Sequence, residues 1–280
     1  MNDHADKEDA GLVPALPTST MTPALATRLR AMTPARVGLY RAGTSVATSE
    51  VLEFQLAHGR ARDAVHALLQ PASLVAALRE LKQPEALLLH SFAKDRTTYL
   101  QRPDLGRTLD QPSRQRLTEH ARGHSATYDL AIVIADGLSA LAVERHAVPL
   151  LAELLPALEK SPHRHIAPIC IVQQGRVAVG DEAGQLLSAS LVVVLIGERP
   201  GLSSPDSLGA YITWQPQPGC TTDAERNCIS NIRPEGLSYA EAAARLLHYI
   251  REAHDKRLTG VALKDPGTPE QGALHSGFGT

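Results

Sequence analysis

The most chemically specific residue is a carboxylate that directly follows a buried strand. Residues 191–196 are six consecutive apolar residues dominated by β-branched types, a pattern typical of a strand covered on both faces in a parallel sheet. Gly-Glu-Arg-Pro-Gly follows at 197–201, so Glu198 lies between turn formers at the carboxyl end of a strand, where open α/β sheets bind ligands. Such a carboxylate must pair with a cation, for example Arg199 or Arg176, or serve a ligand. These residues alone leave both roles open.

Cys228 is a residue whose side chain could act as a nucleophile. It lies in the polar stretch Asn-Cys-Ile-Ser-Asn at 227–231, which we interpret as a loop before the last helix. A catalytic thiol needs a base, and none of the 12 histidines is placed beside it by spacing. We therefore favour an inert cysteine that packs against a ligand or the core.

Asp136 and Val177 lie in two further turn-rich segments. Asp136 and Gly137 follow an apolar strand pattern where a helix should begin, so Asp136 is suited equally to capping that helix and to contacting a ligand. Gly-Arg-Val-Ala-Val-Gly at 175–180 is typical of a short extended element between turns, in which Val177 would serve packing. The sequence has no dinucleotide or P-loop glycine fingerprint, no HExxH and no Asp-x-His-x-x-Gly.

The composition argues against several classes of function. The chain has 280 residues, 43% of them hydrophobic, and a formal charge of −2, so there is no global electrostatic case for nucleic acid or an anionic membrane. No apolar run approaches the ~18 residues of a spanning helix, and the polar, acidic opening does not resemble a secretory signal. Three cysteines without CxxC spacing argue against a disulfide framework and a zinc site. We expect a cytoplasmic protein with reduced thiols.

Hydrophobic periodicity predicts the elements that must position these residues. Strands are predicted at residues 86–90, 130–135, 169–173, 191–196 and 210–214. Helices are predicted at residues 48–68, 72–82, 111–122, 138–160, 181–188 and 239–255. Pro149 and Pro156 interrupt the longest helical stretch, and Ser238 is expected to cap the last helix.

Strands that alternate with helices predict an α/β fold with a Rossmann-like, largely parallel sheet flanked by helices. Residues 1–34, rich in Ala, Pro and Thr, are predicted to be a disordered tail, in which 23–32 could form a helical turn or two on meeting a partner. Residues 35–84 form an N-terminal helical segment, 85–265 the α/β domain and 266–280 a loose tail.

Seven segments, in one order along the chain, carry a resemblance to a known family. They are RVGLYRAGTS at 36–45, EFQLAHGRARDAVH at 53–66, YLQRPDLGR at 99–107, DLAIVIADGLSA at 129–140, GRVAVGDEAG at 175–184, VVVLIGERPGLSSPDSLGAY at 192–211 and DAERNCISNIRPEGLSYAEAA at 223–243. Together they cover about residues 35 to 265 and resemble the small (light) subunit of ethanolamine ammonia-lyase, an adenosylcobalamin-dependent enzyme.

The resemblance implies one subunit of a lyase that converts ethanolamine to acetaldehyde and ammonia by a radical rearrangement. In that family a TIM-barrel large subunit holds the substrate, and a Rossmann-like small subunit closes over the cobalamin at the interface of a hetero-oligomer. The cobalamin contacts implied for this chain are Val177, Glu198 and Cys228, with no catalytic residue and no metal ligand in the chain itself. The resemblance also suggests that the protein is located inside a bacterial microcompartment.

Physical chemistry makes the implied contacts intelligible. A corrin ring presents an apolar rim to Val177 and Cys228, and its peripheral amides can donate hydrogen bonds to Glu198. Two other classes of function stay open: a free-standing α/β enzyme that uses Asp136 or Cys228 on a small molecule, and a pure assembly subunit without a role in cofactor binding.

Overall fold

The computed structural model describes residues 23–33, 35–42, 44–81, 86–123, 127–163 and 165–264. It divides into two compact units between Gly59 and Arg60. This division falls within helix α2 (Thr48–His66). The sequence predicts a boundary further along the chain, between a helical segment that ends at residue 84 and an α/β domain that begins at residue 85. The expected C-terminal tail, residues 266–280, lies outside the described residues.

The first unit contains helix α1 (Pro23–Met32), the short antiparallel strands β1 (Arg41–Ala42) and β2 (Ser45–Val46), and the beginning of α2. Arg30 ties these pieces together because its guanidinium donates to the carbonyl oxygens of Val37 and Gly38, at 3.2 and 3.0 Å, and pairs with Glu50. The segment Pro23–Met32, part of the tail expected to be disordered, is therefore a helix with long-range contacts. Residues 1–22 and 34 lie outside the described residues.

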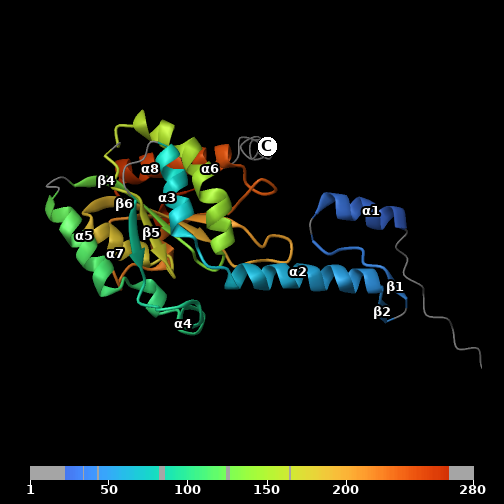
Figure 1. The fold of residues 1–280 in the computed structure, drawn as a ribbon. Coiled ribbons are helices and arrows are strands. Elements are labelled where there is room, and N and C mark those ends of the chain that lie inside the picture. The colour runs from blue at the N-terminus through green and yellow to red at the C-terminus, as the bar shows by residue number, and fades with distance from the viewer. Residues whose placement is uncertain are drawn as a thin grey trace, which may run out of the picture. The chain divides into compact units, whose positions relative to one another are not determined.

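The second unit is built on a six-stranded sheet in the order β3-β5-β4-β6-β7-β8 (Figure 1). The first four strands are parallel, and the last two continue the sheet antiparallel. The strands are β3 (Leu87–His90), β4 (Tyr128–Ala135), β5 (Cys170–Gln173), β6 (Ala189–Gly197), β7 (Leu208–Trp214) and β8 (Arg226–Ile232). The predicted α/β fold with a largely parallel sheet is confirmed.

Helices cover both faces of this sheet. One core cluster joins Leu130, Ile132 and Ile134 of β4 to helices α3 (Pro71–Glu80), α6 (Ala140–Glu159) and α8 (Tyr239–Lys256). The other joins the alternate β4 residues to helices α5 (Gln111–Gly123) and α7 (Val179–Leu186). This period of two along the apolar residues 130–135 of β4 produces the three layers seen in Figure 1.

Two local predictions are corrected by the structure. Residues 227–231, interpreted as a loop around Cys228, lie within strand β8, because the buried polar side chains of this strand find partners. Asn227, for example, donates to the carbonyl oxygens of Gly260 and Leu263 at 3.1 and 3.0 Å. Residues 175–180, expected to be extended, form a turn that runs into α7, so Val177 precedes a helix.

Helix α6 runs through both of its prolines, which were expected to interrupt it. Pro156 is exposed and Pro149 only partly buried, so the carbonyl groups that lose a partner lie toward water, while the leucines on the other side are buried. Helix α4 (Arg96–Gln101) was not predicted, and it begins at a cap in which Asp95 accepts a hydrogen bond from the Thr98 amide at 2.7 Å. The predicted Ser238 cap of α8 is confirmed as part of a capping box.

A stacked histidine pair predicts how stability depends on pH. The rings of His163 and His254 lie 3.8 Å apart, the edge of Trp214 meets His254 at 5.1 Å, and the buried Nε2 of His254 has no hydrogen-bond partner among the described residues. Burial, and then the nearby His163, lower the pKa of His254, although Asp129 and Asp255 act in the opposite direction.

Below the ordinary histidine pKa of about 6.5, the unfolded chain therefore binds a proton that folded His254 resists. We expect the free energy of unfolding to fall as the pH falls from 7.5 to 5.5, and His254→Phe to reduce this dependence. His248→Phe, on the same helix, is the control. Urea unfolding at the two pH values measures the effect, and an equal pH slope for His254→Phe and the unmodified chain would contradict it.

Candidate functional site

The candidate site is a pocket at the carboxyl edge of the sheet, where the parallel strands β4, β5 and β6 end. The loops after these three strands meet around a cavity of about 240 Å³. Its lining residues are Tyr99, Gly137, Leu138, Arg176, Val177, Ile196, Gly197, Glu198, Arg199 and Tyr211. Two of the three predicted cofactor contacts, Val177 and Glu198, thus come together although they follow different strands.

Two glycines let the backbones of neighbouring loops touch beside this pocket. Gly137 has a left-handed conformation with φ of +58°, and a Cβ there would lie 2.2 Å from the carbonyl oxygen of Gly197. A Cβ on Gly197 would lie 2.0 Å from the carbonyl oxygen of Ser139. Only glycine fits at either position, so this side of the pocket is bare backbone. The backbone amide of Leu138 donates a hydrogen bond to the Gly197 carbonyl at 2.9 Å, which holds the two loops together.

Glu198 is fixed by neutral donors. Its Oε2 accepts hydrogen bonds from the hydroxyl of Ser207 and from the amide of Asn231, the latter at 3.2 Å, and its Oε1 accepts from the hydroxyl of Ser230. A carboxylate has about four acceptor positions, so one position on Oε1 remains for a ligand. The side chain lies over Gly209, whose Cβ would come within 2.9 Å of Oε1. Of the two roles left open for Glu198, the ion pair with Arg199 or Arg176 does not form among the described residues.

Cys228 reaches the edge of the same site through Tyr211. The two residues face each other on β8 and β7, so the Tyr211 side chain is the neighbour of the thiol on the adjacent strand. Desolvation by the surrounding protein raises the pKa of Cys228, and the negative charge of Glu198 adds to this effect, while the neighbouring Tyr211 hydroxyl opposes it. The thiol therefore stays protonated at neutral pH, unlike a cysteine nucleophile.

Asp136 stabilises the turn that follows β5, beside the pocket. Its two carboxylate oxygens accept hydrogen bonds from the amides of Gln174 and Gly175, each at 3.0 Å, and Arg96 lies 3.9 Å away. The side chain is fully buried, and burial raises the pKa of Asp136 to about 6. Since both oxygens already bind the turn after β5, the structural reading of Asp136 is favoured over the ligand contact.

A buried tyrosine with two arginines over its ring forms another part of the site, and no motif in the sequence indicates it. Tyr99 on α4 is fully buried, donates its hydroxyl to the carbonyl of Gly175 at 3.3 Å, and has the guanidinium carbons of Arg96 and Arg176 at 4.8 and 4.2 Å from its ring centre. Gly175 and Arg176 lie more than 70 positions from Tyr99 in the sequence, so no local pattern connects them. The only signal in the sequence was the family resemblance of residues 99–107.

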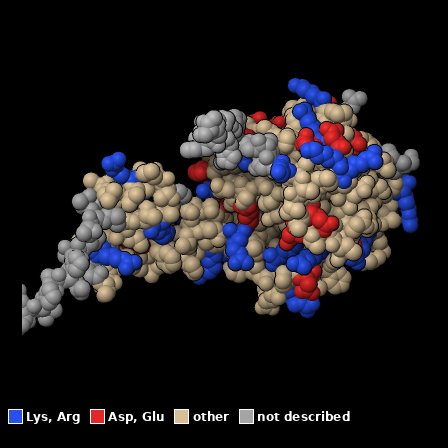
Figure 2. Space-filling view, turned by 180° about the vertical axis from the view of Figure 1, so that it is seen from behind, with Lys and Arg blue, Asp and Glu red and all other residues tan. Residues whose placement is uncertain are grey.

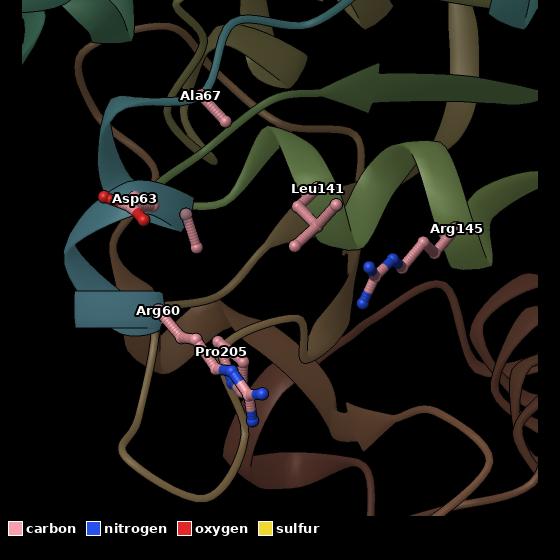
Figure 3. Close-up of a pocket in the computed structure, with 7 residues that line it drawn as sticks. Arg60, Asp63, Ala67, Leu141, Arg145 and Pro205 are labelled. Atoms are coloured by element: carbon pink, nitrogen blue, oxygen red, sulfur yellow. The ribbon is translucent and has the colours of Figure 1, made fainter. Parts of the chain in front are cut away.

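A larger pocket lies elsewhere on the second unit and contains none of the predicted site residues. It has a volume of about 560 Å³ and is lined by Arg60, Asp63, Ala64, Ala67, Leu141, Arg145 and Pro205 (Figure 3). Arg145 is already paired with Asp206 at 2.7 Å. Figure 3 shows the Asp63 carboxylate turned away from Leu141 and Arg145, so these groups do not converge on one point.

The described residues contain neither a cluster of potential metal ligands nor a membrane-spanning helix. No group of three or more His, Cys, Asp or Glu side chains there could hold a metal ion. None of the described helices is long and apolar enough to cross a membrane. All three cysteines are free, and burial raises the pKa of the Cys170 thiol to about 12.

Comparison with known proteins gives one consistent match. The family model described as "Ethanolamine ammonia-lyase light chain (EutC)" matches residues 24–264. A Pseudomonas fluorescens protein named "Ethanolamine ammonia-lyase small subunit" is 58% identical over 237 residues, which are 85% of this chain and 85% of that protein. Proteins with the same name from Ralstonia nicotianae and Xanthomonas campestris are 56% identical over 249 residues (87% and 91% of the two chains) and 57% identical over 238 residues (85% and 86%).

Proposed function

This chain belongs to the ethanolamine ammonia-lyase light-chain family, and from that premise we propose that it forms one wall of a cobalamin pocket completed by a large subunit. The enzyme would be the adenosylcobalamin-dependent lyase that converts ethanolamine to acetaldehyde and ammonia. The observation that carries the proposal is the meeting of Val177 and Glu198 in one pocket, with Cys228 directly opposite a third lining residue, Tyr211, on the neighbouring strand.

The residues of the pocket fit the edge of a cobalamin. Glu198 keeps one acceptor position that suits a peripheral amide N–H, and Val177 and the protonated Cys228 suit the apolar rim of the ring. The cavity of about 240 Å³ is smaller than the ~300–1,000 Å³ of pockets that enclose a drug-sized ligand. A cofactor larger than such a ligand would therefore be covered only in part by this chain, and a second subunit must cover the rest.

The bound cofactor would supply the radical chemistry, and the residues of this chain would position it and exclude water. Ser207, Ser230 and Asn231 hold the Glu198 carboxylate in place before any ligand arrives, so little rotational freedom is lost when it accepts a hydrogen bond. Because the Cys228 thiol is protonated, it provides an apolar contact without competing for metal or substrate.

Exposed apolar side chains support a protein partner for this chain. Eight of the thirteen large hydrophobic residues that are exposed among the described residues belong to the first unit: Leu25, Met32, Tyr40, Val46, Val51, Leu52, Phe54 and Leu56. Leu52 on α2 is 58% exposed and Met32 on α1 is 82% exposed. On the face of the second unit seen in Figure 2, acidic and basic side chains are mixed, so this face has no single-sign charged field that would favour a nucleic acid instead.

We propose the large subunit, a TIM barrel in this family, as the partner in a hetero-oligomer. Location inside a bacterial microcompartment stays a prediction, because residues 1–22 lie outside the described residues. The free-standing enzyme is less well supported, since Asp136 is committed to backbone amides and Cys228 has a raised pKa.

Substitution of Glu198 tests the proposed role. We expect Glu198→Ala to weaken binding of adenosylcobalamin to the assembled enzyme roughly 10- to 100-fold, as for the loss of one hydrogen bond to a charged group. Glu198→Gln should have a smaller effect because its amide oxygen still accepts. Cys228→Ala should weaken cofactor retention without abolishing turnover, whereas complete loss of turnover with normal cofactor binding would favour the free-standing enzyme.

Cofactor affinity should be measured by absorption titration of the assembled enzyme. Glu153→Gln on α6 is the matched control, since Glu153 is exposed and does not line the pocket. The purified complex of Glu198→Ala with the large subunit must be shown intact by gel filtration. An intact complex with unchanged cobalamin affinity would instead support the assembly subunit without a role in cofactor binding.

A further inference from the structure

We propose that Arg176 is a further cofactor-binding residue, which donates hydrogen bonds to an acceptor oxygen on the periphery of the bound cofactor. The acceptor is either the carbonyl of a side-chain amide or an oxygen of the phosphodiester, groups that share the same hydrogen-bonding chemistry. The inference rests on the proposed function and adds a donor to a site so far described by an acceptor and two apolar contacts.

The hydrogen-bonding capacity of Arg176 is largely unused. A guanidinium carries five N–H donors. One nitrogen, Nη2, donates to the carbonyl of Tyr99 at 3.4 Å, and Nε is buried without a hydrogen-bond partner among the described residues. No carboxylate of the described residues lies within 4.0 Å of it. A cation that lines a pocket with donors unsatisfied is costly unless a ligand completes them.

The surroundings of Arg176 add to this excess of donors. Arg96, which also lies over the Tyr99 ring, has a buried nitrogen, Nη2, without a partner among the described residues. The nearest carboxylate to Arg96 is that of Asp136, at 3.9 Å, and both its oxygens already accept backbone amides. The β5 side of the pocket is therefore rich in donors, whereas Glu198 on the β6 side offers an acceptor. A carboxamide, which has both an N–H donor and a carbonyl acceptor, complements the two sides.

Arg176 is held in place before a ligand binds. Its side chain stacks on Tyr99 at 4.2 Å, and its backbone amide donates to the carbonyl of Gly106 at 2.7 Å. Gly106 leaves room for the side chain, because a Cβ there would lie 2.9 Å from Cγ of Arg176. A guanidinium fixed by stacking loses little conformational freedom when it donates to a ligand. Tyr99 and Gly106 are thus positioning residues for Arg176.

The test is the affinity of the complex with the large subunit for adenosylcobalamin, measured by absorption titration. Arg176→Met keeps the stem that packs on Tyr99 and removes the donors, and we expect it to weaken binding roughly 10- to 100-fold. Arg176→Lys should recover part of this loss. Arg107→Met is the matched control. Arg107 follows Gly106 directly in the sequence, but its side chain is exposed and does not line the pocket.

Cobinamide, which lacks the phosphodiester, distinguishes the two acceptors. If Arg176→Met weakens the binding of both cobalamin and cobinamide, the acceptor of the Arg176 hydrogen bond is an amide carbonyl. If it weakens the binding of cobalamin alone, the acceptor is the phosphodiester. Equal affinities for Arg176→Met and Arg107→Met would overturn the inference, as would a lower melting temperature with normal cofactor affinity. If the unmodified complex binds no cobalamin, the proposed function itself fails. If Glu198→Ala weakens binding and Arg176→Met does not, only the present inference fails.

Discussion

Arg226→Ala is expected to lower the free energy of unfolding of this chain by about 3–5 kcal/mol, the cost of breaking a buried ion pair by removing one partner. Arg226 on β8 donates two hydrogen bonds to Asp181 on α7, each at 2.7 Å, and a third to the hydroxyl of Thr213 at 3.0 Å. Asp181 is 1% exposed and Arg226 is 7% exposed. Without the guanidinium, the carboxylate would remain buried with little compensation.

The pH dependence of this loss provides a sharper test. Burial raises the pKa of Asp181 even with Arg226 in place, so removal of Arg226 must raise it further. A buried carboxyl with a raised pKa stabilises the folded state relative to the unfolded one at low pH and loses that contribution as the pH rises through its folded pKa. Arg226→Ala should therefore be less destabilising at pH 5 than at pH 8. Asp181→Ala leaves an arginine that cannot lose its proton, and should show no such relief.

Urea unfolding of the two single variants and of the double variant Asp181→Leu with Arg226→Met measures these effects. The double variant removes both charges together, so we expect it to be much closer in stability to the unmodified chain than either single variant. Single variants that cost less than about 1 kcal/mol, the range of exposed pairs, would contradict the buried role of this pair. The pair also joins the strand that carries Cys228 to the helix that begins just after Val177.

The parallel half of the sheet could be predicted from the sequence because its strands are buried on both faces. The predicted strand at 191–196 corresponds to β6, which begins two residues earlier and ends one residue later. The predicted strand at 130–135 corresponds to β4, which begins two residues earlier and ends where predicted. Glu198 could be singled out as well, since a strand followed by a turn places its next polar residue at the sheet edge. These conclusions depend on local patterns only.

The antiparallel edge and half of the site depend on partners far along the chain. Strand β8 has a polar sequence, and it is a strand because Arg226 and Asn227 find buried partners on other segments. Tyr99 and Tyr211 belong to the pocket for the same reason, since their neighbours Arg176 and Cys228 come from distant positions. No spacing rule connects such residues, so only the family resemblance pointed to Cys228 as a cofactor contact.

Complete dependence on a second subunit is the other large effect that we expect. This chain with adenosylcobalamin should release no ammonia from ethanolamine, because its pocket of about 240 Å³ is too small to enclose the proposed cofactor and neither Asp136 nor Cys228 is activated for catalysis. Addition of the large subunit should produce full turnover. Omission of the cofactor from the same mixture is the control that separates cobalamin-dependent turnover from background ammonia release.

The most direct test of the cobalamin wall is an absorption titration of this chain, alone and mixed with the large subunit, with adenosylcobalamin. We predict that the mixture retains the cofactor through gel filtration and shows its spectrum with the protein peak, while this chain alone retains little. Glu198→Ala should reduce the retained cofactor without dissociating the subunits. Equal retention by the large subunit with and without this chain would contradict the account.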